Sequence, residues 1–346
     1  VTTPDGSAAT GLTTPDIVTF LANMSGLARE GVTHVAYEAS SHGLSQYRNE
    51  GLEVAACAFT NFSRDHLDYH GTMEAYFAAK MRLFAEVVAP GSPAVIHHSG
   101  DGSEWTARAI AAAEARGLDL RTVGEGGAFL RLAAREPTQL GQTLTIEHAG
   151  AVRQVNLPLI GAYQSANALV AAGLALATGV EPSAVFDALT RLQPVRGRLE
   201  RAALNAAGAP VYVDYAHTPD ALEAAMAALR PHVARGGRLI AVFGAGGDRD
   251  TGKRKAMGEV ADDNPRSEDP AVIRAAIRAG AGGQVREIGD RRAAIAAAIG
   301  EAGPGDIVLI AGKGHEQGQI FGAGETMRIE AFDDVEVARE CAGGQC

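Results

Sequence analysis

The chain has few cysteines, few aromatic residues and no hydrophobic run long enough to cross a membrane. Its three cysteines, Cys57, Cys341 and Cys346, form no Cys-x-x-Cys pair, so we expect neither a disulfide framework nor a structural zinc site. No apolar run reaches the roughly 20 residues that a transmembrane helix needs, and no signal-peptide pattern opens the sequence. These absences predict a cytoplasmic protein.

The chain also lacks an excess of positive charge. It has 31 Lys and Arg residues against 41 Asp and Glu residues, a net charge of −10. This balance excludes a general nucleic-acid binder, because neutralising phosphates needs clustered Lys and Arg. It does not exclude a nucleotide substrate, which needs only a local positive site. With 346 residues, 46% of them hydrophobic, the chain is long enough for two or three globular domains.

A nucleotide-binding P-loop is missing as well. Residues 247–254 place two glycines and a lysine at P-loop spacing, but Arg254 stands where a Ser or Thr hydroxyl binds Mg²⁺. Asp248 and Asp250 would also repel a phosphate. The sequence begins with Val1 rather than methionine, so we expect it to start inside a longer protein.

Strand and helix patterns alternate along the chain. In the first half we expect strands at 31–38, 52–60 and 94–96, helices at 73–88, 107–115 and 164–178, and an antiparallel pair at 143–148 and 152–157. After a hinge at 194–198 we expect strands at 211–214, 238–243 and 306–311 and helices at 221–229, 270–279 and 291–299. This alternation predicts a mostly parallel, doubly wound α/β fold, which we divide into domains at 1–193 and 194–346.

Polar residues or glycines follow five of these strands, namely Glu38, Asn61, Asp214, Gly244 and Gly312. Ligands of parallel α/β sheets bind at the carboxyl ends of the strands. The shared placement of these five residues therefore indicates chemistry at the sheet edge.

One segment breaks the alternation. A helical pattern at 255–261 runs directly into the polar residues at 262–265, which leaves no room for the strand that a βαβ series requires. We expect the chain to be internally shortened at 259–263.

Two polar turns offer ligands for a hard cation. Such cations prefer carboxylate oxygen and accept an imidazole, so Glu38 and His66 are candidates for Mg²⁺. The alternative is that His66 and Asp68 only cap the helix that follows, and the spacing does not separate the two. Lys80 lies in a helical pattern and by itself indicates an exposed surface lysine.

A third polar group begins at Asp214. A carboxylate at a strand end can accept two hydroxyl hydrogen bonds from a ribose. Thr218 and Asp220 could equally be simple helix caps. Capping accounts for Thr218, but it leaves the Asp, Tyr and His at 214–217 unexplained.

Further polar clusters supply what a zwitterionic amino acid needs. Arg249 and Arg266 can each form two parallel hydrogen bonds to a carboxylate, and Glu316 can hold an ammonium group. Arg266 ends the cluster Asp263-Asn264-Pro265-Arg266, and Glu316 ends the turn at 312–316.

In this order, the motifs resemble the Mur ligase family, in particular the members that add meso-diaminopimelate to UDP-N-acetylmuramoyl-L-alanyl-D-glutamate. The resemblance runs from about Thr13 to about Val337. It implies a central ATP-binding domain with a mostly parallel sheet, followed by a Rossmann-like C-terminal α/β domain. The family's P-loop and its uridine-binding N-terminal domain would lie before Val1.

The resemblance also implies a role for individual residues. The expected contacts to the UDP-muramoyl dipeptide are Thr13, Thr14, Ser40, Gln46 and Arg48. The expected Mg²⁺ ligands, which are also the catalytic group, are Glu38, His66 and Lys80, the last as a carbamate (N6-carboxylysine). The expected ATP contacts are Asn167, Arg198 and Asp214. The expected diaminopimelate contacts are Arg249, Asp263, Asn264, Pro265, Arg266, Gly312 and Glu316.

The implied activity is ATP-dependent amide formation through an acyl phosphate, in peptidoglycan biosynthesis, by a monomer without a nucleic-acid or membrane partner. Lysine-adding relatives carry a different residue at the position of Arg266. Because the sequence has no P-loop, we expect its ATP hydrolysis to be severely impaired. We also expect the sequence to be a fragment or an imperfect gene copy of a normal ligase. Two alternatives stay open: a remnant that only binds the muramoyl peptide, and another amide ligase resembling folylpolyglutamate synthase, against which the 263–266 motif argues.

Overall fold

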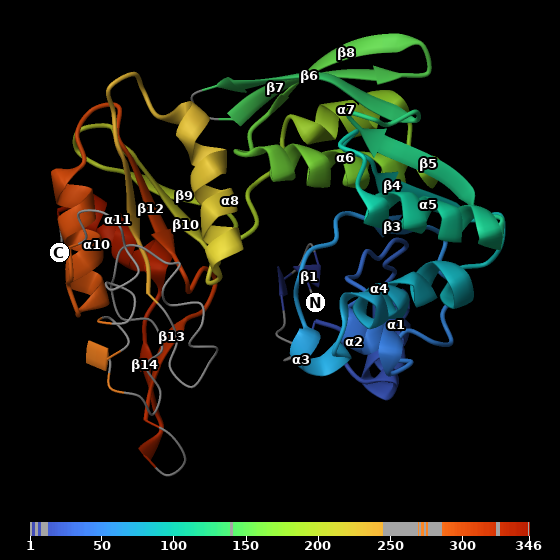
Figure 1. The fold of residues 1–346 in the computed structure, drawn as a ribbon, viewed down its shortest axis with the longest axis horizontal. Helices are drawn as coiled ribbons and strands as arrows, with labels where there is room; N and C mark the ends of the chain where they lie inside the picture. The colour runs from blue at the N-terminus through green and yellow to red at the C-terminus, as the bar shows by residue number, and fades with distance from the viewer. Residues whose placement is uncertain are drawn as a thin grey trace. The chain divides into compact units, whose positions relative to one another are not determined.

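The computed structural model describes residues 2–3, 6–7, 13–138, 141–244, 269, 271–272, 275, 286–322, 326–344 and 346. These residues form two compact α/β units (Figure 1). Unit 1 takes in the described residues of Val1–Arg135, Leu144–Asn156 and Ser165–Thr190, and unit 2 takes in those of Glu136–Thr143, Leu157–Gln164 and Arg191–Cys346. The units interleave along the chain, and the proposed domain boundary at 193/194 stays a prediction.

Unit 1 is built on a six-stranded sheet. Its order is β3 (Cys57–Phe59), β4 (Pro93–His97), β5 (Asp119–Gly124), β6 (Leu130–Thr138), β7 (Gly141–His148) and β8 (Ala151–Leu157). Strands β3 to β6 pair in parallel. The adjoining ends of β6 and β7 are grouped with unit 2. The predicted strands at 52–60 and 94–96 and the predicted pair around Gly150 are confirmed, whereas β5 and β6 were not predicted.

Helices cover both faces of this sheet. The aromatic and aliphatic residues of α4 (Met73–Arg82), of the π-helical turn Leu83–Val87 and of α5 (Glu104–Arg116) pack against Ala94 and Ile96. Val95 points the other way, because successive side chains of a strand alternate between its faces. There α6 (Ala162–Ala177) packs so closely that a Cβ on Gly173 would lie 2.9 Å from the Val95 side chain. All three helices were predicted.

The remaining elements of unit 1 are short or peripheral. They are β1 (Thr2–Thr3), β2 (Gly6–Ser7), α1 (Ile17–Arg29), α2 (Ser41–Ser45), α3 (Leu67–His70) and α7 (Pro182–Leu189). Among the described residues, no helix is both long and apolar enough to cross a membrane.

The predicted strand at 31–38 is wrong. Residues 32–40 are described and form neither helix nor strand, and Val35 is 48% exposed. A strand needs a neighbour to satisfy its backbone N–H and C=O groups, and no described strand pairs with this segment. Glu38 therefore does not stand at a strand end, contrary to the prediction.

Unit 2 is built on a four-stranded sheet of order β11 (Leu239–Val242), β12 (Ile307–Ala311), β10 (Pro210–Asp214) and β9 (Glu200–Leu204). Strands β10 and β11 run parallel to β12, whereas β9 is antiparallel to β10. Helix α8 (Pro219–Leu229) covers one face, and α10 (Arg291–Glu301) and α11 (Asp334–Ala342) cover the other (Figure 1). Tyr212 packs on the α8 side, while Val211 and Val213 pack on the α10 and α11 side.

The parallel strands and helices α8 and α10 of unit 2 confirm the prediction, and β9, α11 and the hairpin of β13 (Gly318–Phe321) and β14 (Arg328–Ala331) were not predicted. A 3-10 turn at Arg230–His232 follows α8. The expected shortening at 259–263 lies outside the described residues, and so does most of the predicted helix at 270–279.

One pair of cysteines is joined, which the sequence did not predict. Cys341 and Cys346 form a disulfide, with Cα atoms 4.6 Å apart. Helix α11 ends between them and the chain continues through Gly343 and Gly344, which brings the two cysteines within bonding range. Because this approach depends on how the helix ends, spacing alone could not reveal it. Cys57 is free and buried, and burial raises the pKa of its thiol to about 12.

Candidate functional site

Thr14 anchors the polar turn of unit 1. Its Oγ1 donates to the Glu38 carbonyl oxygen at 2.9 Å and accepts from the Ser40 N–H at 3.2 Å. Ser40 in turn caps α2, because its Oγ accepts from the Gly43 N–H at 3.0 Å. A Cβ on Gly43 would lie 2.9 Å from the Thr14 Cβ, so the close approach requires glycine. Buried Thr14 thus fixes both ends of the segment 38–43, while Thr13 beside it is exposed.

Gln46 and Arg48 join the same hydrogen-bonded group. Arg48 Nη1 donates to the Thr14 carbonyl oxygen at 2.8 Å, and Arg48 Nη2 donates to Gln46 Oε1. Gln46 Nε2 donates to Tyr69 Oη at 2.8 Å. The structure therefore brings together Thr14, Gln46 and Arg48, which the motifs had linked only by order. Their contact with a muramoyl dipeptide stays a prediction.

Lys80 is not the exposed surface lysine that its helical pattern suggested. It is partly buried on α4, with Nζ 5.0 Å from the centroid of the Tyr76 ring. Burial lowers the pKa of its ammonium group, and the Glu38 and Asp65 carboxylates oppose this shift. A lowered pKa favours the neutral amine, the form that acts as a nucleophile and that carbamate formation requires.

His66 stands at the N-cap position of α3 in a left-handed backbone conformation, φ 52°. Its imidazole makes no capping hydrogen bond within the described part of the chain, so the capping alternative is wrong for this residue. Instead the ring lies 4.9 Å from the His42 ring and 5.8 Å from the Tyr76 ring, centroid to centroid. The Asp65 carboxylate lies 3.6 Å from His66 Nε2.

The donor set of this region fits Mg²⁺ only in part. Burial lowers the pKa of Lys80 and the Glu38 carboxylate opposes this shift, while burial lowers the pKa of His70 and His42, His66 and Lys80 lower it further. Over the described ranges, however, no three His, Cys, Asp or Glu side chains are grouped to hold a metal ion. A carbamate on Lys80 would add the oxygen donors that a hard cation prefers. Glu38, His66 and Lys80 as a ligand set therefore stay a prediction that depends on the carbamate.

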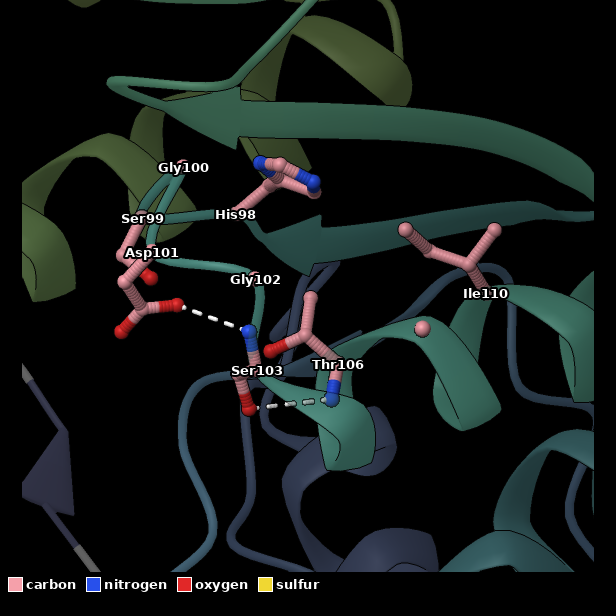
Figure 2. A pocket seen from close by; sticks show the side chains of 9 residues that line it. His98, Ser99, Gly100, Asp101, Gly102, Ser103, Thr106 and Ile110 are labelled. Carbon is pink, nitrogen blue, oxygen red and sulfur yellow. Dashed lines mark hydrogen bonds between the residues drawn. The ribbon is translucent and has the colours of Figure 1, made fainter.

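Unit 1 also contains a cavity of about 220 Å³ away from these residues. The turn at 98–103 between β4 and α5 lines it, together with Thr106, Ala107 and Ile110 (Figure 2). Within the turn, Asp101 accepts from the Ser103 N–H, and Ser103 Oγ accepts from the Thr106 N–H. None of the predicted site residues lines this cavity.

In unit 2, Asp214 ends β10 and is only 6% exposed. Its Oδ2 accepts from the Leu199 N–H at 2.7 Å, and its Oδ1 accepts from the Ala216 N–H at 2.8 Å. Burial raises the pKa of the carboxyl, and these two donors and Arg198 oppose that shift. Both carboxylate oxygens already bind the backbone, so a contact with a ribose diol stays a prediction. Thr218 caps α8, as the capping alternative predicted.

The other predicted ATP contacts are exposed. The Arg198 guanidinium carbon lies 5.3 Å from the centroid of the Tyr215 ring, and the Arg198 carbonyl oxygen accepts from Gln164 Nε2 at 3.2 Å. Asn167 lies on α6 and belongs to unit 1. Its role at a nucleotide stays a prediction.

The turn at 312–316 follows β12 directly beside Asp214, because the Gly312 N–H donates to the Asp214 carbonyl oxygen at 3.1 Å. Gly314 has φ 55°, and a Cβ there would lie 2.7 Å from the Tyr215 Cβ. Glycine is therefore needed for this approach. The predicted meeting of strand ends is confirmed for these loops, since Asp214 pairs with Ala311 across parallel strands.

Lys313 lies in the same turn, and no role was predicted for it. It is fully buried, and its Nζ donates to the Gly318 carbonyl oxygen at 2.6 Å and lies 3.5 Å from Glu316 Oε2. The Glu316 side chain is 38% exposed and so reaches solvent from this pairing. The feature of the sequence that could have pointed to Lys313 is its position between the motif glycines Gly312 and Gly314. The predicted amino-acid contacts Arg249, Asp263, Asn264, Pro265 and Arg266 lie outside the described residues.

The chain is similar to known proteins along most of its length. Residues 1–175 match the Mur ligase middle domain, and residues 197–314 match the Mur ligase glutamate ligase domain. The UDP-N-acetylmuramoyl-L-alanyl-D-glutamate–2,6-diaminopimelate ligase of Zymomonas mobilis subsp. mobilis is 56% identical, covering 98% of this chain and 71% of the relative. The ligase of the same name from Caulobacter vibrioides is 52% identical, covering 94% of this chain and 67% of the relative.

A solved structure gives the same result. A UDP-N-acetylmuramoyl-L-alanyl-D-glutamate–2,6-diaminopimelate ligase matches with a TM-score of 0.66 and 34% identity, over 95% of this chain and 68% of that chain. The resemblance inferred from the motif order is confirmed, and so is the α/β fold class. The chain therefore belongs to the Mur ligase family, alongside ligases named for joining 2,6-diaminopimelate to UDP-N-acetylmuramoyl-L-alanyl-D-glutamate.

Proposed function

We propose that this protein adds meso-diaminopimelate to UDP-N-acetylmuramoyl-L-alanyl-D-glutamate in an ATP-dependent step of peptidoglycan biosynthesis. The observation that carries the proposal is the 56% identity, over nearly the whole chain, to a relative named for that ligation. The protein acts as a monomer in the cytoplasm, and its partners are these two substrates and ATP.

The reaction has two steps. The D-glutamate carboxylate of the dipeptide attacks the γ-phosphate of ATP, which gives an acyl phosphate and ADP. The amine of diaminopimelate then attacks the acyl carbon, the amide bond forms, and phosphate leaves. When bound by Glu38, His66 and the carbamate of Lys80, Mg²⁺ would offset the negative charge of the phosphates.

The muramoyl dipeptide binds at the Thr14, Gln46 and Arg48 group of unit 1. The hydrogen bonds of Arg48 to Thr14 and Gln46, and of Gln46 to Tyr69, hold these donors in place before the ligand arrives. Donors that are already ordered lower the entropic cost of binding a polar ligand.

Diaminopimelate binds in unit 2. The Glu316 carboxylate accepts hydrogen bonds from an ammonium group, and buried Lys313 fixes its position. Arg249 and Arg266 bind the carboxylate of diaminopimelate that lysine lacks. Lysine would leave an arginine without a partner, which makes the site selective.

Replacing Glu316 by glutamine tests this assignment. Hydrogen bonds to charged groups contribute about 1.5–3 kcal/mol, so the KM for diaminopimelate should rise roughly 10-fold to 100-fold while the KM for ATP stays constant. Glu223→Gln, an exposed change on α8, is the matched control and should alter neither KM. A parallel rise in both KM values for Glu316→Gln would refute the role of Glu316.

A further inference from the structure

Arg82 has no role in the reaction described above, yet it reaches the loop that carries Gln46 and Arg48. It lies on α4, two residues after Lys80, and its side chain is 15% exposed. Its Nη1 donates to the Leu44 carbonyl oxygen. The guanidinium carbon lies 3.9 Å from the centroid of the Tyr47 ring. Arg82 thus contacts this loop both by a hydrogen bond and by a cation–π interaction.

Tyr47, which lies between Gln46 and Arg48, has an unusual backbone conformation. Its φ is 60°, in the left-handed region that non-glycine residues seldom adopt. The ring is 58% exposed, so burial in a core does not hold it. The Arg82 guanidinium covers the ring instead, and cation–π contacts of this kind stabilise exposed aromatic groups.

The turn itself closes onto the carbonyl group that Arg82 binds. The Tyr47 N–H donates to the Leu44 carbonyl oxygen at 3.2 Å, and the Arg48 N–H donates to the Gly43 carbonyl oxygen at 2.8 Å. Arg82 therefore binds the loop at the point where its backbone reverses, immediately before Gln46 and Arg48.

Acidic side chains hold Arg82 in place. Glu86, one helical turn later, accepts from Arg82 Nε at 2.9 Å and from Nη2 at 2.6 Å. Glu50 lies 3.4 Å from Nη2 on the loop side. The planar guanidinium can bind Glu86 and the Leu44 carbonyl through its edge and Tyr47 through its face. A lysine ammonium has no such geometry.

We propose that Arg82 is a positioning residue for the muramoyl-dipeptide site. It fixes the loop at 44–48 to α4, the helix that also carries Lys80. The loop and Lys80 are therefore held by one rigid element. This inference rests on the proposed function, because Gln46 and Arg48 are the residues assigned to the dipeptide.

Replacing Arg82 by methionine keeps the apolar stem and removes the guanidinium. Equilibrium binding of UDP-N-acetylmuramoyl-L-alanyl-D-glutamate, measured by calorimetry, should weaken about 10-fold, because a loosened loop must be ordered on binding. Arg82→Lys should lie between the wild type and Arg82→Met, and it serves if the methionine variant fails to fold. The KM values for ATP and diaminopimelate should stay unchanged.

Arg108→Met is the matched control. The Arg108 guanidinium also lies over aromatic rings in unit 1, 4.7 Å from Phe77 and 4.5 Å from Trp105, and Glu104 lies 3.9 Å away at the same helical spacing. Because none of these Arg108 contacts involves the loop at 44–48, loss of the Arg108 guanidinium should leave dipeptide binding unchanged.

Hydrogen exchange of the peptide at 44–50 in the ligand-free protein provides a second measurement, which does not require ligand binding. Arg82→Met should speed this exchange, and Arg108→Met should not. Unchanged exchange, or faster exchange with unchanged dipeptide affinity, would overturn the positioning role. If the wild-type protein binds no dipeptide but Arg82→Met still speeds the exchange, the contact of Arg82 with the loop is upheld and the proposed function is refuted instead.

Discussion

The buried carboxylate of Asp214 offers a direct test of what holds the ligand edge of unit 2 together. It accepts from the Leu199 N–H at 2.7 Å and from the Ala216 N–H at 2.8 Å, and both of these residues are buried. Asp214→Ala would leave two buried donors without an acceptor, each at a cost of about 1–3 kcal/mol. We therefore expect the free energy of unfolding of unit 2 to fall by about 2–5 kcal/mol.

Urea unfolding followed by circular dichroism measures this loss. Asp290→Ala is the control, because Asp290 also accepts a backbone N–H, from Ala293 at 2.7 Å, but at the exposed start of α10. Loss of such a cap costs about 1 kcal/mol. The loss of stability in Asp214→Asn, which keeps one acceptor oxygen, should lie between the losses in Asp214→Ala and Asp290→Ala. If Asp214→Ala lost no more stability than Asp290→Ala, the reasoning about buried donors would be refuted.

Two further predictions concern unit 2. Hydrogen bonds from Arg238 lower the pKa of Asp306 to about 2, from 3.8. Between these two pH values the unfolded state binds more protons than the folded state. Asp306 therefore contributes about 1 kcal/mol to the free energy of unfolding, after allowance for the exposed arginine, and this contribution is present above pH 4 and lost as the pH falls toward 2. Acid unfolding of Asp306→Asn should lack this loss. Gly314→Ala, which brings a Cβ to 2.7 Å from the Tyr215 Cβ, should lower the melting temperature more than Gly208→Ala, where no atom lies within 4 Å; equal shifts would contradict the packing at Gly314.

The sequence predicted most of the buried parallel strands, because their apolar runs are nearly continuous. The segments at 211–214 and 306–311 are examples, and both lie at the centre of the unit 2 sheet. The segment at 31–38 has a similar pattern but pairs with no described strand, and pairing is a property of the neighbours rather than of the segment. The same reason explains why β9, an antiparallel edge strand, was missed.

The candidate site was predicted in its members but not in its contacts. Motif order named Thr14, Gln46 and Arg48, and the structure joins them by hydrogen bonds. Spacing could not decide whether His66 caps a helix, since that depends on where its imidazole points. It also could not reveal the left-handed Tyr47, which ends α2 where the Tyr47 and Arg48 N–H groups donate back to Leu44 and Gly43.

The measurement that tests the proposed function most directly is the product of the ligation. The protein, purified as its cell makes it, is given ATP, UDP-N-acetylmuramoyl-L-alanyl-D-glutamate and either meso-diaminopimelate or lysine, and the products are identified by mass spectrometry. We predict ADP, phosphate and a diaminopimelate adduct in equal amounts, with no lysine adduct. ATP hydrolysis without an adduct, or equal use of lysine, would contradict the proposed function.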